Sequence, residues 1–369
     1  MDQTQELLLK LLKINSKTFN ASGINQVQNL VQMELEELGF KVNRHDSDEY
    51  GDLLVGELPG YTKNFITMIC HADTVFSPDE NSLYSSKEED RIYGPGTIDD
   101  KGGICVALKA IKSFLKYNTS LIYGLRFVCS PNEEIGSVGF QEHFKSLCSD
   151  SPIILGFEPS NERGDIIVGR KGNRWYDIHV VGKKAHAGRH FKDGINACGA
   201  LSSQLHQINK LTELDKGVTV NIGKIEGGDT YNVVSDSAYG QLDVRFPSFE
   251  ERENICNKIE QQLADGLMGT SIKYDVVDDC PPFSSSKEAR DIVDEYIDII
   301  YELEGRSVRA IEVGGASDCN YFSSPNNLVI DGLGPIGGGM HTNDEYIDVK
   351  SLHTRAEAVD KLLMLLQRK

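Results

Sequence analysis

Apolar residues follow two kinds of spacing in the first part of the chain. Where they recur every three or four residues, the spacing predicts helices at residues 4–14, 24–38 and 101–116. Short continuous apolar runs predict buried strands at residues 41–45, 52–58, 65–70, 121–129 and 153–157. This alternation predicts an α/β fold whose central sheet is mixed but largely parallel, with helices on both faces. Sites in such sheets gather beyond the carboxyl ends of the strands.

The pattern changes near residue 171. Alternating strands are expected at residues 175–181, 218–225, 238–246 and 271–277, with helices at 195–210 and 250–265. Their order, β-α-β-β-α-β, is that of a small ferredoxin-like domain. The first pattern then returns, with helices at 287–303 and 349–367 and a strand at 328–330. We therefore predict one α/β domain built from residues 1–170 and 282–369, interrupted by an inserted domain at residues 171–281.

Charge and cysteine content narrow the function classes. The net charge of -18 argues against a nucleic-acid or anionic-membrane binder, because these partners require a basic face. No apolar run approaches the ~18 residues that a membrane span needs, and the first residues do not resemble a signal peptide. The eight cysteines are scattered without a C-x-x-C pair, and several lie in apolar segments. We expect a reducing, cytoplasmic location and neither nucleic-acid nor membrane partners.

His71 and Asp73 follow the apolar run at 65–70 directly. In an extended segment, side chains two positions apart share one face. One of these groups can bind a metal while the other holds the second nitrogen of the imidazole, as metal-binding histidines require. The pair by itself is a weak signal, because short motifs often match by chance. It gains weight from acidic and histidine residues after other strands.

Two acidic pairs are the next candidates. Asp99 and Asp100 follow a glycine-rich turn; Asp100 also suits a helix N-cap, so Asp99 is the better ligand candidate. Phosphate binding by this turn is disfavoured, because two carboxylates would repel the phosphate. Glu133 and Glu134 follow the strand at 121–129. Adjacent glutamates are often only solvated, but here one can bind metal while the other acts as general base on the metal's water.

A carboxylate and an imidazole complete the set. Glu158 ends a short strand, and His341 follows three glycines, where it can also be a histidine on a mobile loop. The candidate ligands are His71, Asp99, Glu134, Glu158 and His341. Imidazole and carboxylate donors suit zinc, cobalt or manganese. Five ligands are too many for one open catalytic zinc, and they suit two metals ~3.5–4 Å apart that share a bridging carboxylate.

In this order, the motifs resemble those of the co-catalytic zinc exopeptidase and deacylase family. Its members include glutamate carboxypeptidase, acetylornithine deacetylase, succinyl-diaminopimelate desuccinylase, aminoacylase and peptidase T. The resemblance covers essentially the whole chain and is greatest to the glutamate carboxypeptidase group, which shares Gly-Pro-Gly-x-x-Asp-Asp-Lys-Gly-Gly and Phe-Glu-Pro. It implies two zinc ions per chain, with cobalt or manganese as substitutes.

The resemblance also implies a role for each candidate. His71 and Glu158 would hold one zinc, Glu134 and His341 the other, and Asp99 would bridge the two. Asp73 would orient His71, and Glu133 would be the general base.

The inserted domain resembles the family's lid, which is usually its dimerisation domain, so the resemblance implies a homodimer. Residues 182–188 are similar to a lid motif whose histidine reaches the partner subunit's active site, which gives His186 the role of stabilising the oxyanion. Arg245 matches an arginine that binds the substrate carboxylate, and Asn232 and Gly315 match substrate contacts. Without the resemblance, His186 would be interpreted as a surface histidine and Arg245 as an exposed arginine in an ion pair.

Two departures from the family pattern border the expected substrate pocket. Residues 172–175 are Gly-Asn-Arg-Trp where smaller residues are usual, and residues 314–318 are Gly-Gly-Ala-Ser-Asp where Gly-Gly-Thr-Asp is frequent. They leave the identity of the substrate open, both its acyl group and its leaving amino acid. The sequence does not specify the native metal either. We predict a di-zinc hydrolase that releases a C-terminal amino acid from a small peptide or an N-acyl amino acid. The alternatives are an aminopeptidase or dipeptidase of the same fold and a silent binding protein, the latter disfavoured by the complete set of site residues.

Overall fold

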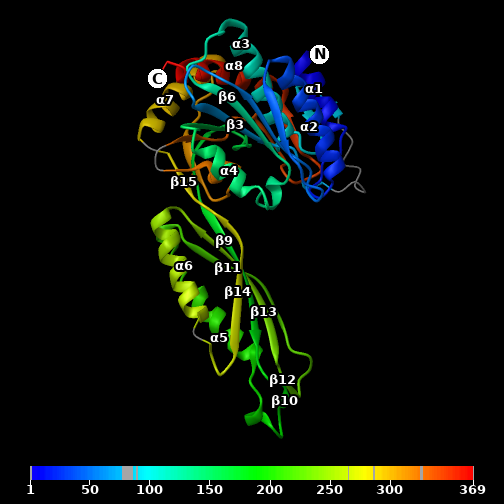
Figure 1. The fold of residues 1–369 in the computed structure, drawn as a ribbon, viewed down its shortest axis with the longest axis vertical. Coiled ribbons are helices and arrows are strands. Elements are labelled where there is room, and N and C mark those ends of the chain that lie inside the picture. The colour runs from blue at the N-terminus through cyan, green and yellow to red at the C-terminus, as the bar shows by residue number, and fades with distance from the viewer. Residues whose placement is uncertain are drawn as a thin grey trace. The chain divides into compact units, whose positions relative to one another are not determined.

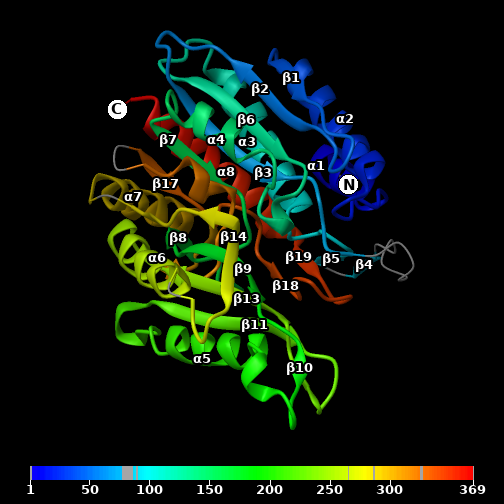
Figure 2. The same cartoon turned by 60° about the horizontal axis from the view of Figure 1, so that its bottom comes forward.

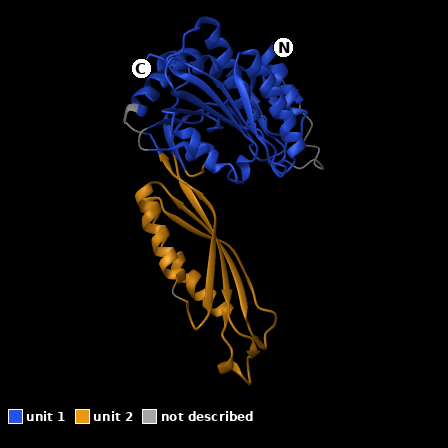
Figure 3. Ribbon diagram, viewed as in Figure 1, with its two compact units in different colours: residues 1–169, 284–313, 317–369 blue, residues 170–283, 314–316 orange. Residues whose placement is uncertain are grey.

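The structure is a computed structural model. It describes residues 2–76, 86–88, 90–264, 266–285, 287–324 and 327–368. The chain divides into two compact units, which Figure 3 colours separately. Unit 1 consists of Met1–Gly169, Ser284–Val313 and Ser317–Lys369, and unit 2 of Arg170–Phe283 and Gly314–Ala316. Among the described residues, no helix is long and apolar enough to cross a membrane.

A six-stranded sheet forms the centre of unit 1 (Figure 1). In spatial order its strands are β1 (Lys41–His45), β2 (Leu53–Leu58), β6 (Gly124–Ser130), β3 (Phe65–His71), β7 (Ile153–Gly156) and β17 (Leu328–Ile330). β3 pairs in parallel with β6 and β7, and β7 pairs in parallel with β17. β2 runs antiparallel to both of its neighbours. The sheet is mixed but largely parallel, and the carboxyl ends of β3, β6 and β7 lie at one edge.

Helices cover both faces of this sheet (Figures 1 and 2). They are α1 (Gln3–Leu12), α2 (Ala21–Glu37), α3 (Lys101–Tyr117), α4 (Gln141–Cys148), α7 (Lys287–Glu304) and α8 (Val349–Leu366). Met68 of β3 and Phe127 of β6 share one buried core with apolar residues of α1, α2, α3, α7 and α8. Arg126 points to the opposite face, where it donates a hydrogen bond to the carbonyl of Leu147 in α4.

Short strands form two further sheets. One has the order β15 (Phe283–Ser284), β8 (Ile166–Arg170) and β16 (Ala310–Val313). The other has the order β18 (Gly337–Gly338), β19 (Tyr346–Asp348), β5 (Arg91–Tyr93) and β4 (Ser86–Glu88). Because β19 pairs with β5, the glycine-rich turn after β5 lies beside the loop between β18 and β19. This pairing brings two of the candidate site segments together.

Unit 2 is a four-stranded antiparallel sheet with two helices. Its elements are β9 (Gly172–Val181), α5 (Ala197–Asn209), β11 (Thr219–Gly227), β13 (Ser237–Phe246), α6 (Phe249–Ala264) and β14 (Ser271–Cys280). The spatial order β11-β13-β9-β14 is that of the ferredoxin-like split β-α-β fold. Tyr176, Ile178 and Val180 point from β9 into a core of their own with α5 and α6. The alternate residues of β9 and β13 are therefore left on the opposite, partly exposed face.

Candidate metal centre and active site

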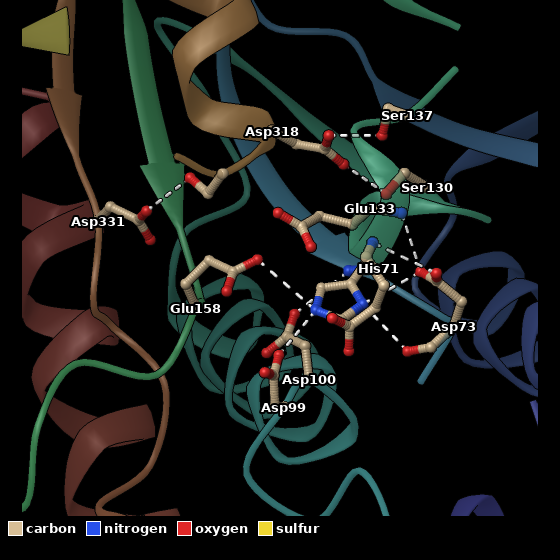
Figure 4. Close-up of polar contacts among 12 residues, drawn as sticks. His71, Asp73, Asp99, Asp100, Ser130, Glu133, Ser137, Glu158, Asp318 and Asp331 are labelled. Carbon is tan, nitrogen blue, oxygen red and sulfur yellow. Dashed lines mark hydrogen bonds and ion pairs between the residues drawn. The ribbon is translucent and has the colours of Figure 1, made fainter. Parts of the chain in front are cut away.

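His71 lies at the end of β3, between the ends of β6 and β7, and its side chain is 1% exposed. Its Nε2 is 2.9 Å from Asp99 Oδ1 and 3.6 Å from Glu158 Oε1. Its Nδ1 is 3.1 Å from the carbonyl oxygen of Asp73 and 3.3 Å from Asp73 Oδ1. Figure 4 shows the carboxyl groups of Asp99 and Glu158 directed at the imidazole. Nε2 is thus the nitrogen available to a metal, and Asp73 fixes the orientation of the ring.

A second cluster shares Asp99 with the first. Asp99 Oδ2 is 3.2 Å from His341 Nε2, which is 3.4 Å from Glu134 Oε2. Among the residues that the structure describes, two three-residue groups offer metal-ligand atoms within 4.8 Å of one another. One is His71, Asp99 and Glu158, and the other is Asp99, Glu134 and His341. Carboxylate and imidazole donors without a thiolate suit divalent zinc, cobalt or manganese. The donor set therefore fits a pair of divalent cations with Asp99 between them.

The carboxylates of the cluster lie close together, and this shifts the pKa values of the site residues. Hydrogen bonds to Asp99 and Glu134 raise the pKa of His341 to about 10. Burial raises the pKa of Glu134, and burial together with the charge of Glu158 raises the pKa of Glu133 well above its usual range. A divalent cation would reduce this repulsion between carboxylates. The geometry of the cluster and its negative charge therefore both favour divalent cations.

Asp73 also anchors the loop that carries the two adjacent glutamates. These residues open a single 3-10 turn, Glu133–Ile135, directly after β6. The backbone N–H groups of Glu133 and Glu134 lie 3.0 Å and 3.4 Å from Asp73 Oδ1 and Oδ2, and the Thr18 hydroxyl donates to Oδ2 at 2.7 Å. One buried carboxylate thus fixes both His71 and the glutamate pair. Glu133 is left beside the metal groups without belonging to either.

Residues 68–365 match the sequence pattern of Peptidase family M20/M25/M40. The chain belongs to this family. It is 27% identical over 363 residues to carboxypeptidase G2 from a Pseudomonas species, covering 97% of this chain and 88% of that relative. It is 24% identical over 327 residues to a succinyl-diaminopimelate desuccinylase of Rickettsia bellii, covering 83% of this chain and 82% of the relative. The protein is accordingly a hydrolase of the metallopeptidase and amidohydrolase type.

Solved structures of the M20 family share the fold. The aminopeptidase PepT of Bacillus cereus superposes with a TM-score of 0.79 at 22% identity, covering 98% of both chains. An M20 family metallo-carboxypeptidase of Sulfolobus solfataricus, Sso-CP2, superposes with a TM-score of 0.78 at 19% identity, covering 100% of both chains. The predicted family and fold class are confirmed.

Glu345 supports the candidate site of this M20 hydrolase, although its sequence position did not indicate a role. Its side chain is buried and accepts backbone hydrogen bonds from Gly96 at 2.9 Å, Ile98 at 2.8 Å and Asp99 at 3.1 Å. It therefore fixes the glycine-rich turn that presents Asp99. The pairing of β19 with β5 creates this contact, and two three-residue strands leave no clear periodic signal.

Asp318 is a second residue whose role was missed, since the sequence placed it only within a segment bordering the substrate pocket. It is buried and accepts hydrogen bonds from the hydroxyls of Ser130 and Ser137, the latter at 2.5 Å (Figure 4). These serines flank the loop of Glu133 and Glu134 on both sides. Burial raises the pKa of Asp318 to about 6. The Asp318 carboxylate therefore links the two ends of this loop by hydrogen bonds, although it comes from a distant part of the sequence.

Asp100 occupies the N-cap position of α3, as the sequence allowed, but its carboxylate makes no capping hydrogen bond. Instead, Asp100 Oδ2 accepts the backbone N–H of His71 at 3.2 Å. The peptide bond between Asp99 and Asp100 is cis. Asp100 thus supports the end of β3 from beside the metal groups.

The other candidate residues belong to unit 2. His186 lies in β10 (Ala185–His186), which pairs with β12 (Val233–Val234), and the Asn232 carbonyl accepts the N–H of Ala187 at 2.9 Å. His186 Nδ1 accepts backbone hydrogen bonds at 3.1 Å and 3.2 Å, so in the neutral ring Nε2 carries the proton.

Arg245 and Gly315 complete the candidates of unit 2. Arg245 lies near the opposite end of β13 from β12, and its Nε donates to Asp243. The Gly315 carbonyl accepts a hydrogen bond from Arg170 at 3.2 Å. Within unit 2, the structure therefore brings His186 and Asn232 together and leaves Arg245 apart from them.

Proposed function

We propose that this M20 hydrolase cleaves an amide bond and releases an amino acid that carries a free carboxylate. It acts as a carboxypeptidase of the glutamate-carboxypeptidase type or as an N-acyl-amino-acid deacylase. The observation that carries the proposal is the sharing of Asp99 by two metal-ligand groups, with Glu133 beside them. Similarity to carboxypeptidase G2 and to the desuccinylases supports the substrate class, since both names denote enzymes that cut next to an acid-bearing product.

The proposed cofactor is a pair of zinc ions. His71 and Glu158 would hold one ion, Glu134 and His341 would hold the other, and Asp99 would serve both. When bound, such a pair supplies Lewis-acid chemistry at the scissile carbonyl and lowers the pKa of a water. Unit 1 is then the catalytic, metal-binding domain.

Glu133 is the proposed general base. It takes the proton of the attacking water and later passes it to the leaving nitrogen. Asp73 holds the backbone of this residue, and the same carboxylate holds the ring of His71. The base and one ligand are therefore positioned by a single anchor, which favours a fixed geometry at the reacting centre.

Substrate binding is assigned to unit 2, the proposed lid and dimerisation domain. Arg245 binds the free carboxylate, a task that suits the planar fork of arginine. Asn232 and Gly315 contact the substrate. His186, supplied by the partner subunit of a homodimer, stabilises the oxyanion through Nε2. A cytoplasmic location is also proposed; all eight cysteines are free thiols, which suits a reducing compartment.

The test is amino-acid release from a panel of N-acyl amino acids and unblocked dipeptides by zinc-loaded protein. Release from blocked substrates supports the proposal and identifies the leaving amino acid. Cleavage of unblocked peptides alone would instead assign the protein to the aminopeptidases and dipeptidases. Release from neither set, with two zinc ions bound per chain, would contradict the proposed substrate class.

A further inference from the structure

The face of the unit 2 sheet opposite its helices carries a hydrogen-bonded chain of three side chains. Asp243 and Arg245 are two positions apart on β13 and therefore share this face. Asp243 lies opposite Trp175 of β9 in the register of the two strands. Trp175 Nε1 donates to Asp243 Oδ1 at 3.1 Å, and Arg245 Nε donates to the two oxygens of Asp243 at 2.8 Å and 3.0 Å. The carboxylate thus receives donors from both sides.

The contact between Arg245 and Asp243 differs from an ordinary arginine–carboxylate ion pair in the nitrogen that it uses. In a bidentate pair with a carboxylate, arginine commits two parallel N–H groups to its partner. Here both contacts come from Nε, and in the part of the chain that the structure describes, the two terminal nitrogens of Arg245 make no hydrogen bond. The side chains of Arg245 and Asp243 are 26% and 32% exposed, so the pair lies on the partly exposed face of the sheet.

We infer that Asp243 and Trp175 are positioning residues that aim the free fork of Arg245 at the carboxylate of the substrate. This inference rests on the proposed function, in which Arg245 binds that carboxylate. Arginine loses considerable rotamer freedom when it is held in one geometry, and a residue that holds it in advance lowers this cost of binding. Asp243 fixes the guanidinium through Nε, and the indole N–H of Trp175 limits the rotation of the Asp243 carboxylate.

The hydrogen-bonded arrangement of Trp175, Asp243 and Arg245 implies a specific chemical group on the substrate. A guanidinium held in this way offers two coplanar donors, which match a carboxylate and do not match a carboxamide. The pair therefore contributes to selection of a free carboxylate over its amide. A purely structural ion pair on the sheet surface would have no such selectivity, and surface pairs of this kind add little to stability.

The test compares Asp243→Asn and Trp175→Phe with the unaltered protein, all zinc-loaded and full length. Each is assayed on an N-acyl amino acid and on the same compound with its carboxylate converted to the carboxamide. We expect both variants to raise KM for the carboxylate substrate by about tenfold, with kcat within about twofold, because binding precedes the chemistry. Hydrolysis of the carboxamide should change little. Gln241→Ala is the matched control: it lies on the same strand and face but bonds to Asp177 and Tyr239, and its KM should be unaltered.

Two outcomes would overturn the inference in different ways. An unaltered KM for the carboxylate substrate in both variants would show that the chain is structural, with the proposed function intact. If the unaltered protein hydrolyses the carboxamide as well as the carboxylate, the carboxylate-releasing function fails and the inference fails with it. Trp175→Phe keeps an aromatic ring in place, removes the indole N–H and changes no charged group, so it decides the matter if Asp243→Asn does not fold.

Discussion

The side chain of Glu345 accepts a hydrogen bond of 3.1 Å from the backbone N–H of Asp99, which lies 246 positions earlier in the sequence. The same carboxylate holds the N–H groups of Gly96 and Ile98. The residue proposed to bridge both metal ions is thus presented by a turn that a buried carboxylate shapes. Replacing a residue that holds a metal ligand in position typically costs about 10- to 100-fold in metal affinity or activity.

We expect Glu345→Gln to weaken metal binding by about 10- to 100-fold, because the amide group cannot accept all three N–H groups. Turnover should recover when zinc is raised, since the ligands themselves are intact. Metal titration by equilibrium dialysis, with activity measured on the same samples, checks this. Normal metal affinity combined with lost activity would mean that Glu345 acts on the chemistry rather than on the ligand turn.

Replacing Glu133 distinguishes the role of a general base from that of a metal ligand. We expect Glu133→Gln to keep both metal ions and to lose activity by about 10²- to 10⁴-fold, the usual contribution of a general base. The measurement is metal content per chain together with kcat. Glu134→Gln, one position along the same turn, is the matched variant and should lose metal. Full activity of Glu133→Gln would remove Glu133 from the mechanism.

The prediction of the long elements and the choice of candidate ligands both followed from local patterns in the sequence. β3 is a continuous apolar run that ends at His71, and α3 has a clear helical period, so each could be placed without tertiary information. The parallel sheet then implied that residues at strand ends would meet. Family resemblance, rather than spacing, supplied the individual roles.

What the sequence did not reveal depends on tertiary contacts. The strands β4, β5, β8 and β16 have between three and five residues each, α4 has only eight, and none of them was predicted from the sequence. Glu345 and Asp318 read as ordinary acidic residues, because their partners are 246 and 181 or more positions away. Their importance comes from burial, which no local pattern indicates.

The shared ligand predicts unequal effects on metal content. Asp99→Ala should abolish binding of both ions, because Asp99 belongs to both groups. His341→Ala and Glu158→Ala should each leave one ion, since each residue belongs to one group. Metal content per chain after dialysis measures this directly. Equal losses in all three variants would indicate a single mononuclear site.

Burial of Asp318 predicts a pH dependence of stability. Its pKa is raised from 3.8 to about 6 in the folded chain, so between these values the folded state binds more protons than the unfolded state. The stabilisation from this residue is therefore present below pH 3.8 and is lost as the pH rises through about 6. Asp318→Asn keeps the size and can still bond to Ser130 and Ser137.

We expect denaturant unfolding of the metal-free protein to show that Asp318→Asn gains stability relative to the unaltered chain as the pH rises from 4 to 7. Free energies of unfolding at several pH values, with a chelator present, provide the test. Ser137→Ala, which removes one partner and no charge, is the control and should show no such pH-dependent gain. A difference that is constant with pH would mean that Asp318 stays ionised throughout.

Complementation between two inactive variants tests whether His186 acts across a dimer. His186→Ala and Glu133→Gln should each be nearly inactive alone. If the histidine comes from the partner subunit, a mixed dimer has one active centre that combines an intact Glu133 with an intact His186, and one that lacks both. Random mixing makes half of the dimers mixed, so activity should return to about a quarter of the original in a closed two-fold dimer. The subunits are mixed by unfolding and refolding them together, with each variant refolded alone as the control. If His186 served its own subunit, every active centre in the mixture would lack one of the two groups, and no activity would return.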